Sequence, residues 1–288
     1  MAGQQGHDLP RVGFIGLGDI GAPMARRLLR QGFPLSIWAR RPETIAAFAE
    51  PEARAVADLA ELGRSVDIAA ICVGHDADLL DLLFTRGLIA AMRPGGALVI
   101  HSTVHPGTVS QAAEAGRARG VAVIDAPVSG GRSGAAQGTL TLMVGCEEAD
   151  LALVRPMLEA LGTPTRLGPV GAGQTAKILN NTLMSANIGL AADAMACAAD
   201  LGLDPAAFAQ ILARSSGNSA GLGILMARLA EFRAGGNPLR PAILAKDVGH
   251  FGAIHLPGHG ADRLDAAARQ GVAALTHLFA PANGPPAA

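Results

Sequence analysis

Three polar side chains recur along one face of a long apolar stretch just past the middle of the chain. Lys177, Asn181 and Ser185 are spaced four residues apart, so a helix aligns them on one side. A lysine on an apolar helix costs free energy unless it is paired, reaches solvent at a helix end, or takes part in chemistry. The alternative to chemistry is a lysine whose ammonium extends into water near the start of the helix.

The element that carries these side chains is the stretch 171–201. It opens at a glycine turn, continues for about 30 residues without proline and is rich in Ala, Leu and Met. This composition predicts one helix of roughly 45 Å. Because the stretch is apolar on nearly every side, we expect the helix to be buried.

A glycine-rich turn near the N-terminus predicts a dinucleotide site. The apolar run 12–15 leads into GxGxxG and then into a helix-like stretch, 22–30. In such a turn Gly16 makes the bend, Gly18 lets the backbone approach a pyrophosphate, and Gly21 lets helix and strand pack closely. A glycine-rich turn without a ligand is the alternative. The expected cofactor contacts are Gly16, Leu17, Gly18, Asp19, Ile20 and Gly21.

The next predicted strand, 35–38, ends where a ribose-binding residue is expected. An NAD site typically has Asp or Glu there, whereas this chain has Ala39, Arg40 and Arg41. Guanidinium groups bind a 2′-phosphate through charge-assisted hydrogen bonds. We therefore expect NADP(H) ahead of NAD(H), with Arg40 and Arg41 as contacts; two solvated surface arginines are the alternative.

The first half continues as alternating strands and helices, which predicts a parallel sheet covered by helices on both faces. Strands are expected at 68–73, 97–100 and 121–124, with helices near 76–84 and 107–119. Ligands bind such sheets at the carboxyl ends of the strands. Val73-Gly74 and Ser102-Thr103 are therefore candidate cofactor contacts, or else ordinary loop residues.

A glycine-dense loop, 125–134, precedes another predicted strand, 138–145. Consecutive glycines let backbone N–H groups converge on an anion, and Ser129 adds a hydroxyl donor. A flexible linker is the alternative interpretation, although a linker needs no strand on each side.

Composition limits the function further. In 288 residues, 23 basic and 24 acidic side chains give a net charge of −1, and they are well mixed along the chain. Nucleic acid is therefore not an expected partner. Half of the residues are hydrophobic but only 3% are aromatic, so the core must consist of Ala, Leu, Val and Ile.

The three cysteines, Cys72, Cys146 and Cys197, are far apart and form no CxxC pair. Their number and spacing exclude a disulfide framework and favour a reducing cytoplasm. The polar N-terminus has no signal segment, and no run of about 18 apolar residues lacks polar interruption, so neither secretion nor membrane insertion is expected.

Four separated motifs resemble those of the β-hydroxyacid dehydrogenase family, in the same order. They are Gly13-Phe14-Ile15-Gly16-Leu17-Gly18, the loop 125–131, the helix start 171–181 and Lys246-Asp247. The family includes 3-hydroxyisobutyrate dehydrogenase, tartronate semialdehyde reductase, the glyoxylate and succinic semialdehyde reductases and, more distantly, 6-phosphogluconate dehydrogenase. The resemblance covers roughly residues 11 to 247 and specifies the family rather than one substrate.

The resemblance implies an α/β fold: an N-terminal Rossmann domain with a doubly wound parallel sheet, joined by a long interdomain helix to an all-helical C-terminal domain. The corresponding boundaries are 11–170, 171–201 and 202–279, with flexible ends at 1–10 and 280–288. It also implies a homodimer or homotetramer, which matches the large apolar helical content of the second half.

The resemblance also assigns roles. GxGxxxKxxxN places Lys177 as general acid/base and Asn181 as its substrate-orienting neighbour. The loop DxPVSGG would hold the carboxylate of a small anionic substrate through Ser129, Gly130 and Gly131. Lys246 would lie at the cofactor and substrate cleft.

The second half departs from the family after Asp247, where relatives continue as a long helix. Here glycine and proline interrupt 249–260, so we expect a loop. His250, His255 and His259 lie in this loop without regular spacing, which does not favour a metal site. Helices are expected at 206–214, capped by Asp204, and near 222–232 and 262–278.

These observations predict an NADP(H)-dependent oxidoreductase that interconverts a small β-hydroxy acid and its semialdehyde or keto acid. Hydroxyisobutyrate, glycerate, 4-hydroxybutyrate and a sulfonated analogue all fit the motifs. An imine reductase is the first alternative, although such enzymes commonly have another residue in the place of Lys177. A non-catalytic NADPH-binding protein is the second; the altered segment after Asp247 supports it, and Lys177, Asn181 and Ser129 together disfavour it.

Overall fold

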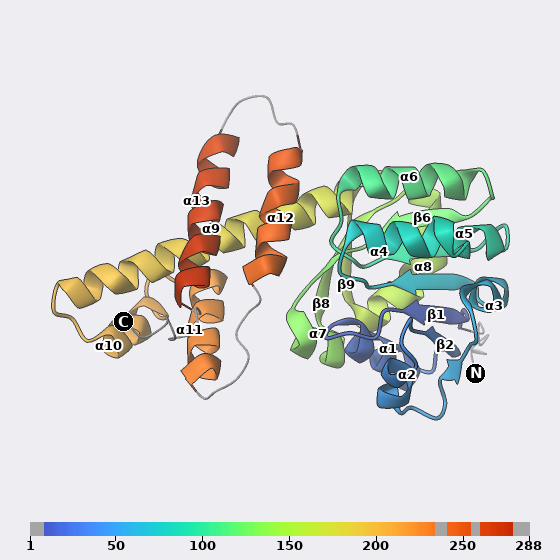
Figure 1. Cartoon of the computed structure of the whole chain (residues 1–288), viewed down its shortest axis with the longest axis horizontal. Helices are drawn as coiled ribbons and strands as arrows, with labels where there is room; N and C mark the ends of the chain where they lie inside the picture. The colour runs from blue at the N-terminus through green and yellow to red at the C-terminus, as the bar shows by residue number, and fades with distance from the viewer. Residues whose placement is uncertain (1–8, 234–240, 255–259, 279–288) are drawn as a thin grey trace, which may run out of the picture. The chain divides into compact units, whose positions relative to one another are not determined.

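The computed structural model describes residues 9–233, 241–254 and 260–278, and divides the chain into two compact units, 1–177 and 178–288. The first unit contains the strands and most of the shorter helices, and the long helix α9 (Ala172–Asp200) is shared between the units (Figure 1). The assignment of this helix as a separate interdomain segment remains a prediction.

Within the described residues, the first unit is built on a nine-stranded sheet. Its strands are β1 (Val12–Ile15), β2 (Leu35–Trp38), β3 (Arg54–Ala55), β4 (Ile68–Ile71), β5 (Ala97–Ile100), β6 (Ala122–Asp125), β7 (Val128–Ser129), β8 (Leu140–Gly145) and β9 (Gly162–Gly168). The order β3-β2-β1-β4-β5-β6 is that of a Rossmann fold, and these neighbours are all parallel. The predicted doubly wound fold is thus confirmed, while β8 adds antiparallel pairs with β6 and β7.

Successive residues of the central strands enter opposite cores, which explains why these strands are apolar without interruption. Val12 and Phe14 of β1 pack in one cluster, and Ile15 packs in the other. The first cluster is completed by α1 (Gly21–Arg30), α2 (Pro42–Phe48), α7 (Gly131–Gln137) and α8 (Glu148–Leu161). The second is completed by α3 (Leu59–Ser65), α4 (Asp76–Leu80), the π-helical turn η1 (Asp81–Thr85), α5 (Leu88–Ala91) and α6 (Pro106–Arg117).

The second unit contains the remainder of α9 with α10 (Pro205–Leu212), α11 (Ala220–Arg233), α12 (Pro241–Ala253) and α13 (Ala261–Leu278). Ile188 of α9 packs with Leu225, Leu244 and Leu275 from the three helices that follow α10. Asp204 caps α10 by accepting the backbone N–H of Ala207 at 2.6 Å, as its sequence predicted.

Three expectations need correction. The segment 125–134 is not one loop, because it contains β7 and the start of α7. The segment after Asp247 remains helical to Ala253, since Val248 and Phe251 are buried and their packing offsets the cost of the helical glycines. The long helix is buried only in part: Leu183 and Leu190 are 53% and 61% exposed.

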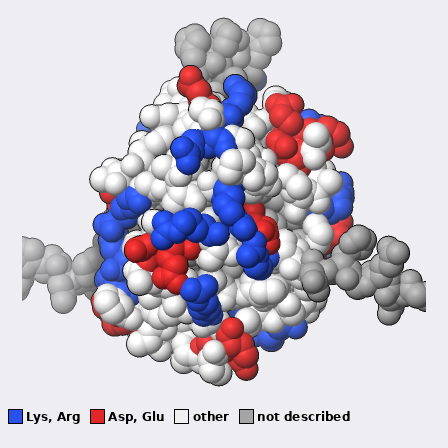
Figure 2. Space-filling view, turned by 90° about the vertical axis from the view of Figure 1, so that its right-hand side faces the viewer, with Lys and Arg blue, Asp and Glu red and all other residues white. Residues whose placement is uncertain are grey.

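Among the described helices, α9 is the one whose length and composition would let it cross a membrane. The core helices of soluble proteins meet the same criteria, and α9 contains the fully buried side chains of Ile178 and Ile188. On the face shown in Figure 2, basic and acidic side chains lie beside one another rather than in one basic stripe.

Candidate active site

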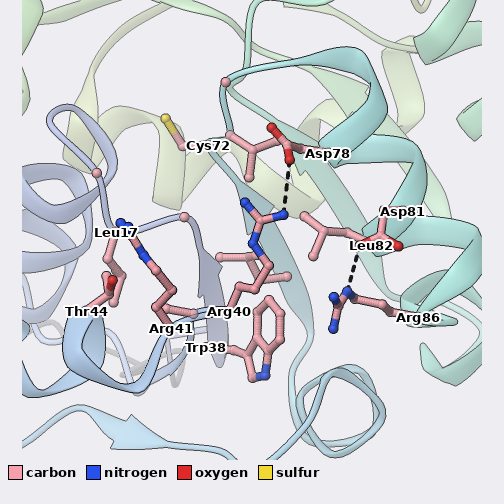
Figure 3. A pocket seen from close by; sticks show the side chains of 16 residues that line it. Leu17, Trp38, Arg40, Arg41, Thr44, Cys72, Asp78, Asp81, Leu82 and Arg86 are labelled. Atoms are coloured by element: carbon pink, nitrogen blue, oxygen red, sulfur yellow. Dashed lines mark hydrogen bonds and ion pairs between the residues drawn. The ribbon is translucent and has the colours of Figure 1, made fainter.

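The first feature of the site is a cavity at the carboxyl ends of β1, β2 and β4. Ile15, Trp38 and Ile71 end these strands at the same edge of the sheet because the strands pair in parallel register. The loops that follow them meet there around a cavity of about 280 Å³ (Figure 3). Its lining residues are Ile15, Gly16, Leu17, Gly18, Trp38, Ala39, Arg40, Arg41, Thr44, Cys72, Val73, Gly74, Asp78, Asp81, Leu82 and Arg86.

The glycines of the first loop have the geometry that a pyrophosphate requires. A Cβ on Gly16 would lie 2.2 Å from the carbonyl oxygen of Cys72, and one on Gly21 would lie 1.9 Å from that of Gly16. A Cβ on Gly18, by contrast, would meet nothing within 4 Å, so the backbone there borders open space. No side chain caps α1 and no acid lies in its first turn, which leaves its N-terminus suited to an anion. These residues fit a dinucleotide.

The arginines after β2 do not face the cavity alone. Arg40 Nη1 lies 3.4 Å from Asp78 Oδ1, and Arg86 Nε lies 2.6 Å from Asp81 Oδ2 (Figure 3). The residues directly after β2 carry no carboxylate, as the sequence shows, but two other segments bring Asp78 and Asp81 into the cavity lining. Asp78 lies on α4, 38 residues from Arg40 in sequence. The residues that follow β2 therefore could not have predicted this contact.

An aromatic wall adds to the cavity. The guanidinium carbon of Arg86 lies 5.7 Å from the centre of the Trp38 ring, within cation–π range. Neither Trp38 nor Arg86 was predicted as part of the site, and the same holds for Thr44, Asp81 and Leu82. One rule could have indicated these residues, namely that ligands bind at the carboxyl ends of parallel strands. It applies to the segment after β4 as well as to the loop after β2.

The predicted cofactor contacts divide into two groups. The cavity lining includes Gly16, Leu17, Gly18, Arg40, Arg41 and Val73. It does not include Asp19, Ile20, Gly21, Ser102, Thr103 or Lys246. Asp19 Oδ1 instead lies 3.6 Å from Arg132 Nη1, at the start of α7. Ser102, beside Thr103, accepts the backbone N–H of Val73 at 2.7 Å and so joins the loops after β4 and β5.

The second feature is the start of α9, which is fixed to the sheet by buried hydrogen bonds. Asp125 Oδ1 accepts the N–H of Gly171, and its Oδ2 accepts that of Gln174, both at 2.7 Å. The Gln174 side chain donates to the carbonyl of Ser102 at 2.8 Å and accepts the N–H of Val104 at 3.1 Å. Burial raises the pKa of Asp125 to about 6, and the bonds from Gly171 and Gln174 oppose that rise.

Lys177 follows Gln174 by three residues on this anchored helix. It is only 9% exposed, so most of its side chain is buried. A buried lysine on a rigid element is a candidate for proton transfer.

Ser129, Gly130 and Gly131 lie at the turn from β7 into α7. Gly130 and Gly131 have φ values of +130° and +62°, which glycine adopts without strain. A Cβ on Gly131 would meet nothing within 4 Å, so this backbone also borders open space. The turn therefore has room for a small anion.

In the second unit, Asn181 is held by Asp247, which was not among the predicted site residues. Asn181 Nδ2 donates to Asp247 Oδ2 at 2.6 Å, and its Oδ1 accepts from Asn180 at 3.1 Å. Asp247 is 2% exposed, and its Oδ1 lies 3.4 Å from Lys246 Nζ. Asp247 thus connects two of the predicted site residues and fixes the orientation of the Asn181 amide.

No cluster of three or more His, Cys, Asp or Glu side chains that could hold a metal occurs within the described ranges. His250 belongs to α12 rather than to a loop, while His255 and His259 lie outside the described residues.

Two family descriptions match the chain. Residues 11–173 match the NAD binding domain of 6-phosphogluconate dehydrogenase. Residues 171–274 match the NAD-binding domain of NADP-dependent 3-hydroxyisobutyrate dehydrogenase.

The chain is also similar to individual proteins of this kind. An NAD-dependent L-serine dehydrogenase of Pseudomonas aeruginosa is 36% identical over 84% of both chains. A 3-hydroxyisobutyrate dehydrogenase of the same organism is 36% identical over 72% of this chain and 70% of its own. Among solved structures, Psf3 in complex with NADP+ and 2-OPP is 28% identical with a TM-score of 0.81, covering 93% of this chain and 95% of that one.

Proposed function

The chain belongs to the β-hydroxyacid dehydrogenase family, and from that premise we propose that it transfers a hydride between NADP(H) and a small β-hydroxy acid or the matching semialdehyde. The observation that carries this proposal is the buried Lys177 on a helix whose first turn is tied to the cofactor-binding sheet. The nicotinamide, when bound, supplies or accepts the hydride.

Lys177 is the proposed general acid in the direction of reduction. As a carbonyl accepts a hydride, its oxygen gains negative charge, which an ammonium within hydrogen-bond reach stabilises before donating a proton. In the direction of oxidation the neutral amine accepts the hydroxyl proton. Asn181, whose amide Asp247 orients, holds the substrate oxygen without competing for the proton.

The substrate carboxylate is the proposed ligand of the turn formed by Ser129, Gly130 and Gly131. Backbone N–H groups at positive φ can converge on an anion, and the Ser129 hydroxyl adds a donor. Lys246 contributes a positive charge, in addition to that of Lys177, for the anionic groups of the substrate and cofactor. Both assignments favour a small carboxylate substrate over a neutral aldehyde.

Arg40 and Arg41 support a preference for NADP(H), because both line the cavity and both can bind a 2′-phosphate. Asp78 and Asp81 line the same cavity and partly offset this positive charge. We therefore propose a graded preference for NADP(H) with measurable use of NAD(H).

Two other functions are less well supported. An imine reductase commonly lacks a lysine at the position of Lys177. A non-catalytic nucleotide-binding protein has no need of a buried lysine or of the bond between Asn181 and Asp247.

The three cysteines are all free thiols, which agrees with the proposed cytoplasmic location.

A substrate screen tests the proposal. Small semialdehydes are supplied with NADPH, and β-hydroxy acids, including 3-hydroxyisobutyrate and L-serine, with NADP+ and NAD+; reduced-nicotinamide absorbance reports turnover. We expect turnover in both directions with one carboxylate-bearing substrate pair. NADPH binding without turnover of any compound would favour the non-catalytic function, and reduction of cyclic imines alone would favour the imine reductase.

A further inference from the structure

We propose that Asp78 is a specificity-determining residue that acts through Arg40 to limit the preference for NADP(H) over NAD(H). The inference rests on the proposed binding of these nucleotides in the cavity of the first unit. Asp78 lies outside the glycine-rich turn 16–21 and outside the segment after β2.

The geometry places Asp78 opposite Arg40. Arg40 follows β2, whereas Asp78 lies in the first turn of α4, and the two side chains meet at 3.4 Å across the cavity (Figure 3). A Cβ on Gly74 would lie 4.0 Å from Asp78 Oδ2, so the carboxylate also lies close to the loop that follows β4. Asp78 therefore faces the space that Arg40 offers to an anion.

The three arginines of the cavity are not paired alike. Arg41 Nε lies 3.7 Å from Glu43 Oε1, and the two side chains are 75% and 72% exposed. This ion pair therefore separates at little cost in free energy. Arg86 is held by Asp81 and lies over Trp38. Asp78 is only 31% exposed and cannot turn into solvent as freely as Glu43, so Arg40 faces the more firmly placed acid.

This arrangement has opposite effects on the two cofactors. The 2′-phosphate of NADP(H) carries close to two negative charges, so at Arg40 it must share the guanidinium with Asp78 and is repelled by that carboxylate. NAD(H) has a neutral hydroxyl at the same position, which is not repelled and can donate a hydrogen bond to a carboxylate. Asp78 on α4 thus favours NAD(H) in the way that an Asp or Glu directly after β2 does in an NAD site, but to a smaller extent.

The test compares Asp78→Asn with the wild-type protein in the full chain. Dissociation constants are measured for NADPH and NADH by fluorescence titration, and for 2′,5′-ADP and 5′-AMP by calorimetry, so the readout does not require turnover. We expect Asp78→Asn to tighten NADPH and 2′,5′-ADP about 3- to 10-fold, with no gain for NADH or 5′-AMP.

Glu159→Gln is the matched control, because Glu159 Oε1 lies 3.4 Å from Arg155 Nη1, the same distance as in the pair of Asp78 and Arg40, but Glu159 is outside the cavity lining. It should change the ratio of the NADPH and NADH constants by less than about twofold, since it leaves the Arg40 pair intact. Asp78→Ser provides the same test if the asparagine variant does not fold.

Three results would overturn the inference while leaving nucleotide binding in place: an unchanged NADPH to NADH ratio in Asp78→Asn, weaker NADPH binding in that variant, or an equal change of the ratio in Glu159→Gln. Wild-type protein that binds none of the four nucleotides would instead refute the proposed function, and the inference with it.

Discussion

Asp125 Oδ2 accepts the backbone N–H of Gln174 at 2.7 Å, and this bond joins the end of β6 to the first turn of α9. The same carboxylate accepts the N–H of Gly171, so one buried acid satisfies two of the N–H groups that a helix N-terminus leaves unpaired. Because Lys177 follows three residues after Gln174, its backbone starts from a position fixed by the sheet.

Replacing Asp125 with Asn tests this anchor. The amide keeps the size of the side chain but turns an NH₂ group toward a backbone N–H, which leaves buried donors unpaired. We expect the free energy of unfolding to fall by about 1–3 kcal/mol, measured by urea denaturation. Asp204→Asn, at the exposed cap of α10, is the control and should change it by only a few tenths of a kcal/mol. Equal losses in both variants would refute a special role for Asp125.

Lys177→Ala should retain the fold and NADPH binding but lower kcat by about 10² to 10⁴, the usual loss when a general acid is removed. Lys177→Arg should be almost as slow, because a guanidinium hardly releases its proton. Steady-state kinetics at saturating NADPH, with cofactor titration as the folding control, give the result. Turnover within about threefold of wild type in either variant would exclude Lys177 as the acid.

Replacing both Arg40 and Arg41 with Ala should raise the KM for NADPH by about tenfold or more, because two charge-assisted contacts with the 2′-phosphate are lost. The KM for NADH should remain nearly unchanged. Arg155→Ala on α8 removes an arginine remote from the cavity lining and serves as the control. An equal loss with both cofactors would contradict the 2′-phosphate assignment.

His101 predicts a pH dependence of stability. Burial lowers its pKa from 6.5 to about 4, and its Nε2 has no hydrogen-bond partner among the described residues. Below pH 6.5 the unfolded chain therefore takes up the proton first, and the native state loses stability progressively until about pH 4. The total loss attributable to His101 is about 3 kcal/mol.

Urea unfolding of wild type and His101→Gln at pH 7 and pH 4.5 measures this effect. Burial raises the pKa of Asp125 to about 6 from 3.8, so Asp125 acts in the opposite direction between those values, and its contribution is common to both proteins. Their difference should shrink as the pH falls, because only wild type carries the buried imidazole. A difference that does not change with pH would disprove the assignment.

We predict a homo-oligomer that uses α9. Leu179, Leu183 and Leu190 are 40%, 53% and 61% exposed, and at 100° per residue they lie within about 40° of one another on the helix. Light scattering should show at least a dimer at micromolar concentration, and the double variant Leu183→Glu, Leu190→Glu should lower its mass. Leu153→Glu, at an exposed leucine of α8, should leave the mass unchanged. A wild-type monomer would defeat the prediction.

The sequence by itself determined the elements whose cause is local. The alternation of apolar runs, glycines and helical stretches located β1, the glycine loop, β2, β5 and α9, in most cases to within a residue. Asp204 as the cap of α10 followed from its own position before a proline. Each of these depends on hydrogen bonds and packing periodicities among residues close in the chain, which one sequence displays directly.

The tertiary structure alone decided which polar groups meet. Asp78 faces Arg40, Asp247 holds Asn181 and Asp125 anchors Gln174, across 38, 66 and 49 residues of sequence respectively. The helix after Asp247 likewise persists through two glycines because Val248 and Phe251 are buried. Strand register and helix packing bring these partners together, and both depend on the whole buried core rather than on the residues beside each partner.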